Sequence, residues 1–84
     1  TMPPTDVHIK TSIERTGKEY KEVHEWIDKD EAKKVERHDI TKMPQHIKEI
    51  ELKWGEEGVR EYVQHIHDDV KKRIADTLAY FGVK

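Results

Sequence analysis

The chain has 84 residues, of which 40% are charged, and its 16 basic and 18 acidic residues leave a net charge of −2. Nucleic-acid-binding domains normally carry a basic face and a high pI, so the sequence pI of about 6.3 argues against that class. No apolar run approaches the roughly 18 residues of a membrane-spanning helix, and the absence of cysteine excludes disulfides and thiolate metal sites. We therefore expect a cytoplasmic protein that binds neither nucleic acid nor membrane.

One domain is expected over residues 2–84, because a chain of this length builds a single small core. Thr1 precedes Met2, and we interpret Thr1 as the remnant of a cleaved expression tag. Val, Ile, Leu and Phe total only 18 residues, so the core is thin and a homodimer would help to stabilise it. Frequent Glu and Lys without Asn or Cys also resemble the composition of thermophile proteins.

The first half of the chain predicts two helices separated by Gly17. Before Gly17, Ile9 and Ile13 lie about one helical turn apart. The alternation of Val7 and Ile9 also fits a strand, but no partner strand follows, which favours a helix. After Gly17, three apolar side chains and one histidine recur at helical spacing: Tyr20, Val23, His24 and Ile27.

The second half of the chain predicts further helices. A third helix follows the acidic stretch 28–31 and carries Ala32 and Val35, with Ile40 near its end. Pro44 disrupts a helix interior, so a fourth helix starts near it and ends at Gly55. The last helix has the longest apolar stripe: Val59, Tyr62, Val63, Ile66, Val70, Ile74, Leu78 and Phe81. These elements predict an all-α fold, a small antiparallel bundle of four or five helices with a long C-terminal helix.

Six histidines are distributed among acidic residues: His8, His24, His38, His46, His65 and His67. Imidazole is the commonest metal ligand in proteins, and its ordinary pKa of about 6.5 lies near physiological pH. The histidines therefore indicate either a metal site or a pH-responsive surface. Protonation of all six would change the formal charge from −2 to +4.

His24 is the most informative histidine, because it lies on the apolar face of the second helix and its ring is expected to point inward. Asp28 follows one helical turn later, so both side chains can reach the same place. A carboxylate there can bind a metal or hold the imidazole in one tautomer. A core histidine hydrogen-bonded to Asp28 fits the same pattern, and both interpretations stay open.

The other histidines give weaker signals. His38-Asp39 matches the adjacent His-Asp pair with which HD phosphohydrolases bind metal. Those enzymes need a larger helical domain, however, and two adjacent residues are a short motif. His8 and His46 each stand at the first turn of a predicted helix, where each can complete a site or be exposed. Residues 65 and 67 are about 200° apart around a helix and cannot share one metal. We interpret these two as surface histidines beside acids.

The stretch Tyr20-x-x-x-His24-x-Trp26-x-Asp28, with His8 before it and Arg37-His38 after it, resembles a family of short uncharacterised prokaryotic helical domains. The resemblance covers residues 8–46 and implies a site built on these histidines, without implying an activity. Those domains continue with a more basic and apolar stretch that carries a further His or His-His pair. Here Asp39 and a single His46 follow instead, and the terminal helix lies outside the resemblance.

The sequence thus predicts a metal-binding domain. The central ligands are His24 and His38, the further contributors are His8 and His46, and Asp28 is a ligand or supports one. Nitrogen and oxygen donors without sulfur suit zinc, nickel, iron or manganese. No general base or substrate pocket is identifiable, so no reaction is assigned.

The alternative is a non-enzymatic oligomerisation or protein-interaction module whose histidines are structural. Aromatic rings such as Trp26 and Trp54 would then contribute to a dimer interface.

Overall fold

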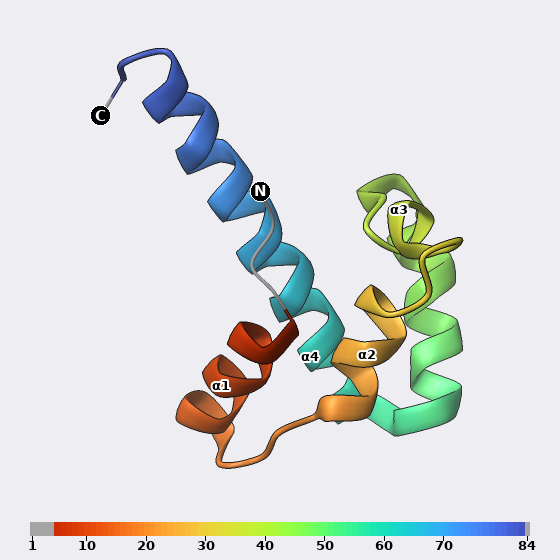
Figure 1. The fold of residues 1–84 in the computed structure, drawn as a ribbon. Helices are drawn as coiled ribbons and strands as arrows, with labels where there is room; N and C mark the ends of the chain where they lie inside the picture. Colours follow the sequence, from red (N-terminus) through yellow and green to blue (C-terminus); the bar gives the residue numbers. More distant parts are fainter. Residues whose placement is uncertain (1–4, 84) are drawn as a thin grey trace.

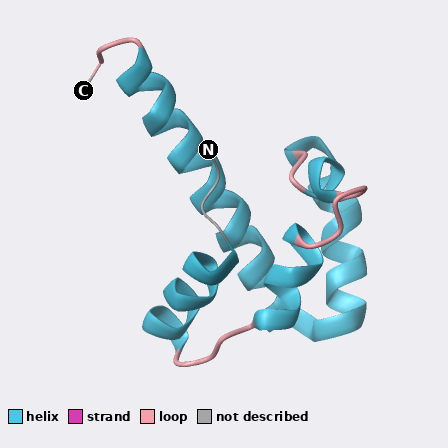
Figure 2. Cartoon of the chain, in the orientation of Figure 1, coloured by secondary structure: helices cyan, strands magenta, loops and turns pink. Residues whose placement is uncertain are grey.

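The fold of residues 5–83 is described by a computed structural model, and every regular element in that range is helical (Figures 1 and 2). The elements are α1 (Thr5–Thr16), α2 (Lys21–Asp28), α3 (Lys34–Arg37), the 3-10 turn η1 (Ile40–Lys42) and α4 (Met43–Tyr80). The all-α class and the long C-terminal helix are confirmed, while the antiparallel bundle stays a prediction. None of the described helices combines the length and apolarity needed to cross a membrane. Thr1 and Met2 lie outside the described residues, so the interpretation of the start of the chain stays a prediction.

The helix boundaries follow the residues that break helices. Gly17, at φ +82°, ends α1 and donates its N–H to the Ile13 carbonyl at 2.8 Å. Pro44 lies in the first turn of α4, where its missing N–H costs no helical hydrogen bond.

Gly55 divides α4 into two helical segments, residues 43–54 and residues 56–80, which diverge from this point (Figure 1). Its φ of +69° and ψ of −164° are readily available to glycine alone. One turn later, a Cβ on Gly58 would lie 2.5 Å from the Cβ of Trp54, so the chain can turn back this tightly only with glycine there. The predicted break at Gly55 is therefore confirmed.

The hydrophobic core lies where α2 packs against both segments of α4. Among the described residues, the fully buried apolar side chains are Val23, Ile27, Ile50, Tyr62 and Ile66. Five buried apolar side chains make a small core, and most other buried side chains of the described chain are polar. Stability must therefore also depend on how those polar groups are paired.

The third predicted helix is much shorter than the sequence pattern indicates. Only the four residues of α3 are helical, and Val35, an apolar residue of the predicted helix, is 84% exposed. Asp39 has an extended backbone, and its carboxylate accepts hydrogen bonds from the N–H and hydroxyl of Thr41, at 2.9 and 2.6 Å. This cap starts η1 and ends the helix before it, which leaves His38 at the break.

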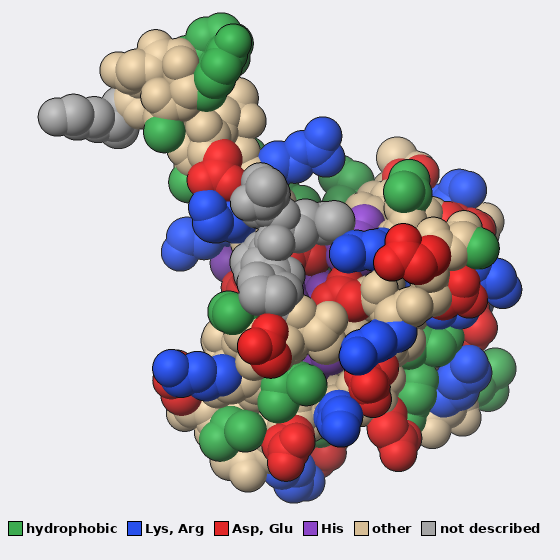
Figure 3. Space-filling model, viewed as in Figure 1, with side chains coloured by type: hydrophobic (Ala, Val, Ile, Leu, Met, Phe, Trp, Pro, Cys, Tyr) green, Lys and Arg blue, Asp and Glu red, His purple; other side chains and the backbone are tan. Residues whose placement is uncertain are grey.

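The apolar stripe of the last helix is buried only in part. Val70, Ile74, Leu78 and Phe81 are 38–71% exposed, contrary to the expectation that the whole stripe faces a core. The reason is geometric, since the final turns of α4 extend beyond the other helices (Figure 1). Figure 3 shows hydrophobic side chains gathered at this protruding end.

Candidate metal centre

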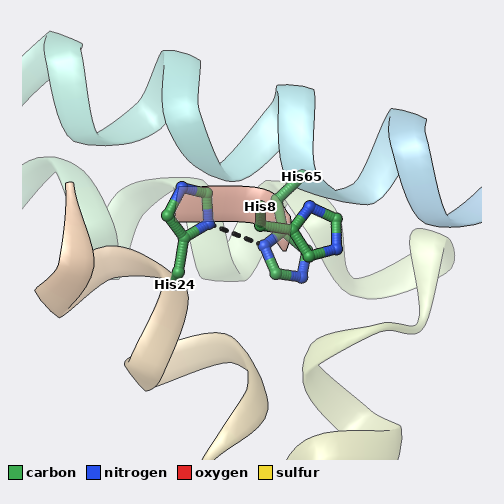
Figure 4. Close-up of side chains that lie close together, drawn as sticks. All are labelled: His8, His24 and His65. Atoms are coloured by element: carbon green, nitrogen blue, oxygen red, sulfur yellow. Dashed lines mark hydrogen bonds between the residues drawn. The ribbon is translucent and has the colours of Figure 1, made fainter. Parts of the chain in front are cut away.

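Three histidines from three helices meet between α1, α2 and α4 (Figure 4). The rings of His8 and His65 stack with their centroids 3.6 Å apart, and His24 Nδ1 lies 2.8 Å from His65 Nδ1. Each of the three residues is at most 3% exposed. The inward orientation of His24 is confirmed. The predicted surface position of His65 is wrong, and so is the exposed alternative for His8.

A second group shares His65 and adds three side chains around its other ring nitrogen: Asp28 from α2, His38 at the end of α3, and Asp69 from α4. His38 Nε2 lies 3.1 Å from Asp28 Oδ1 and 3.0 Å from Asp69 Oδ2. His65 Nε2 lies 3.3 Å and 3.2 Å from the same two oxygens. Two ligands of a tetrahedral zinc ion, each bound at 2.0–2.1 Å, are roughly 3.3 Å apart. The four His–Asp distances are therefore close to this spacing, and the ligand atoms of the four residues all lie within 4.8 Å of one another.

Three of these four atoms have no hydrogen bond although they are buried: His38 Nε2, His65 Nε2 and Asp69 Oδ2. Their contacts within the group, at 3.0–3.3 Å, are ion-pair contacts between imidazole and carboxylate. Buried polar atoms nearly always have a hydrogen bond, so three without one at a single point require an explanation. The three histidines form one group that could hold a metal ion, and the two Asp with His38 and His65 form another. An ion in the second group would satisfy all three atoms.

The remaining polar atom of each of these four side chains does have a partner. The contacts are Thr5 Oγ1 donating to Asp28 Oδ2 (3.0 Å), His38 Nδ1 donating to the Lys34 carbonyl (2.6 Å), His8 Nε2 donating to Asp69 Oδ1 (2.9 Å), and His65 Nδ1 facing His24 Nδ1 (2.8 Å). Hydrogen bonds of this kind orient metal-binding side chains in known metal sites. A neutral His38 ring has one N–H, and this N–H is on Nδ1, so Nε2 keeps a lone pair that can bind a metal.

The charges of the group are mutually stabilising. Burial acts to lower the pKa of His38, but the carboxylates of Asp28 and Asp69 outweigh it and raise that pKa to about 9. The same carboxylates raise the pKa of His65 against the effect of burial. Burial alone would raise the pKa values of Asp28 and Asp69, yet the imidazoles hold both well below the usual range. The site thus favours positive charge at its centre, supplied by protons or by a metal ion.

His24 differs from the other two imidazoles. Burial, followed by the charges of His65 and His8, lowers the pKa of His24 to about 4. Its ring contacts Ser12 Oγ at 2.7 Å through Nε2 and His65 through Nδ1. The alternative of a core His24 hydrogen-bonded to Asp28 is therefore wrong, since the partners of His24 are Ser12 and His65.

The structure does not bring His46 into either group. His46 is only 6% exposed, and its ring lies edge-on to Trp26 and Tyr62, with centroids 5.8 and 6.2 Å away. The alternative that His46 is exposed to solvent is thus also wrong, because His46 packs in the apolar core. The side chain of His67 is 63% exposed, as predicted. Asp39 caps η1, which argues against the HD pairing with His38.

The sequence interpretation missed His65 and Asp69 as members of the site. One signal was available, since His65 and Asp69 repeat the four-residue spacing of His24 and Asp28. Each pair therefore places an imidazole and a carboxylate on one face of its helix.

The stretch that carries the family resemblance also positions His38. The Arg37 guanidinium lies 3.9 Å from the centroid of the Trp26 ring, and Arg37 Nη1 donates to the Trp26 carbonyl at 2.5 Å. This contact ties the end of α3 to α2 next to Asp28. Comparison with protein-family models, curated proteins and solved structures finds no match to the chain. The resemblance accordingly stays a prediction.

Proposed function

We propose that this domain binds one divalent transition-metal ion through Asp28 Oδ1, His38 Nε2, His65 Nε2 and Asp69 Oδ2. The observation that carries the proposal is the convergence of these atoms, of which three are buried without a hydrogen bond. In this proposal His8 and His24 support the ligands through their hydrogen bonds, and His46 takes no part.

The donor set narrows the choice of metal. Two imidazoles and two carboxylates, with His–Asp distances of 3.0–3.3 Å, suit zinc, with iron, manganese and nickel as competitors. Four ligands from the protein fill a tetrahedral zinc site, and such closed sites usually stabilise a fold. The side chains of His38, Asp28 and Asp69 are at most 10% exposed, which agrees with a closed site. We therefore favour a structural metal over a hydrolytic one.

Tag-free protein dialysed against zinc is expected to retain one zinc ion per chain, measured by elemental analysis after gel filtration. Tag removal matters because a polyhistidine tag binds zinc itself. Parallel dialysis against nickel, iron(II) and manganese ranks the metals. Failure to retain any of these ions would contradict the proposal.

Self-association is a second candidate function, and one observation favours it. The C-terminal part of α4 carries an apolar stripe, Val70, Ile74 and Leu78, whose residues are 38–54% exposed. A second copy of the chain carries the same stripe, and pairing of two such stripes would extend the small core, in which five apolar side chains of the described residues are buried.

Leu78→Glu is expected to convert any dimer to a monomer, because the glutamate would place a charge in the paired stripe. Sedimentation velocity at two protein concentrations measures the change. Leu52→Glu is the matched control, since Leu52 is 90% exposed on the other segment of α4. A wild-type protein that sediments as a monomer at both concentrations would exclude this function.

A further inference from the structure

A row of four side chains leads from the proposed ligand His65 to the edge of the protein. The contacts are His65 Nδ1 to His24 Nδ1 (2.8 Å), His24 Nε2 to Ser12 Oγ (2.7 Å), Ser12 Oγ to Glu61 Oε2 (2.8 Å) and Glu61 to Arg15 Nη2 (2.7 and 2.9 Å). Ser12, His24 and Glu61 are at most 2% exposed, whereas the Arg15 side chain is 37% exposed. Buried side chains at these distances form one continuous hydrogen-bond chain (Figure 4 shows its first link).

All the hydrogen bonds of this row run in one direction, which is set at the Arg15–Glu61 end. Arg15 only donates, and the Glu61 carboxylate only accepts. Ser12 has one hydroxyl hydrogen, which it donates to Glu61, so its oxygen accepts from the N–H at His24 Nε2. Two ring nitrogens 2.8 Å apart need one hydrogen between them. With its hydrogen on Nε2, His24 accepts at Nδ1, and the hydrogen in that contact belongs to His65.

We propose that Arg15, Glu61, Ser12 and His24 are positioning residues that hold His65 in the tautomer with hydrogen on Nδ1, which leaves Nε2 as the metal-binding atom. This inference rests on the proposed metal site. The opposite tautomer would place an N–H on Nε2, where the ligand atoms of Asp28 and Asp69 converge, and would block metal binding. Hydrogen bonding to His24, which the buried Glu61 carboxylate supports in turn, also makes His65 a stronger electron donor.

Ser12→Ala is expected to weaken zinc binding by about 10–100-fold, the usual effect of losing a partner behind a metal ligand. Competition with a chromophoric chelator measures the affinity. Tyr62→Phe is the matched control, since it also removes a buried hydroxyl, but one that faces His46 at 3.4 Å. Glu61→Gln is a second variant, with the volume unchanged, and is expected to weaken binding as well. Zinc affinities of both Ser12→Ala and Glu61→Gln equal to that of Tyr62→Phe would overturn the proposal.

The nitrogen-15 shifts of the imidazole rings separate this inference from the metal site itself. In the metal-free protein, His24 is expected to carry hydrogen on Nε2 alone, and Ser12→Ala is expected to allow both tautomers. Hydrogen on His24 Nδ1 in the wild type would overturn the positioning chain even if zinc binds. Conversely, a wild-type protein that has the expected His24 tautomer but binds no metal would refute the proposed function. The direction of the hydrogen bonds from Arg15 to His65 would still stand.

Discussion

His65→Ala is expected to lower zinc affinity about a hundredfold or more, whereas His46→Ala is expected to change it by less than about threefold, because residues without shared partners act independently. Both histidines lie on α4 and both are buried, at 1% and 6% exposure. They differ in their surroundings, since His65 faces two carboxylates and His46 faces two aromatic rings. The pair therefore compares a proposed ligand with a structural histidine of the same burial.

The magnitude follows from the usual strength of closed zinc sites. Zinc binds such sites in small domains with about 10–16 kcal/mol. One of four ligands thus accounts for roughly 3 kcal/mol, which is about a hundredfold in affinity. Titration with zinc in the presence of a competing chelator measures both variants.

Thermal melts in excess chelator provide the control for folding. Both substitutions leave a cavity and remove a ring contact, so both are expected to lower the melting temperature of the metal-free protein. Equal zinc affinities for His65→Ala and His46→Ala would contradict the assignment of His65 as a ligand. A loss of zinc affinity in His46→Ala alone would instead support the sequence prediction that His46 is a metal ligand.

The sequence was sufficient for most of the helix ends and insufficient for the site, and α4 shows why. Gly17, Pro44 and Gly55 act locally, through backbone angles and a missing N–H, so their effects can be predicted without knowing the fold. The buried face of the segment 56–80 cannot be predicted in this way. It consists of Gly58, Glu61, Tyr62, His65, Ile66 and Asp69, of which half are polar.

Hydrophobic periodicity correctly predicts Tyr62 and Ile66 on the buried face, but it also predicts Val63 and Val70, whereas Glu61, His65 and Asp69 are buried in their place. The difference arises because α1 supplies partners for the polar face: Ser12 and Arg15 for Glu61, and His8 for Asp69. A polar face is buried only when another element satisfies it, and that element is 46 or more residues away in the chain. The helical spacing of Glu61, His65 and Asp69 was visible, but their partners were not.

Removal of the metal is expected to lower the melting temperature by about 20 °C at pH 8. Free metal at a thousand times its Kd stabilises a protein by about 4 kcal/mol. For a domain of this size, each 1 kcal/mol corresponds to about 4–8 °C. Melts followed by circular dichroism, with and without chelator, measure the difference.

The difference between metal-loaded and metal-free protein is expected to grow between pH 6.5 and pH 9. The pKa of His38 is raised to about 9 in the folded metal-free protein, whereas it is about 6.5 in the unfolded chain. Its stabilising effect is therefore complete below pH 6.5 and is lost as the pH rises through 9. A metal ion takes the place of that proton, so the loaded protein does not lose this stabilisation.

His38→Gln is the control variant, because glutamine is uncharged and cannot take up that proton. It is expected to show less than half of the wild-type response to the chelator, because a hundredfold weaker site is stabilised by only about 1.4 kcal/mol at the same free metal. It is also expected to lack the loss of stability between pH 6.5 and 9 that His38 causes. A wild-type melting temperature that the chelator leaves unchanged at every pH would contradict the metal site. If the chelator lowers the melting temperature equally at pH 6.5 and pH 9, the metal site is supported. The metal then does not replace a proton on His38.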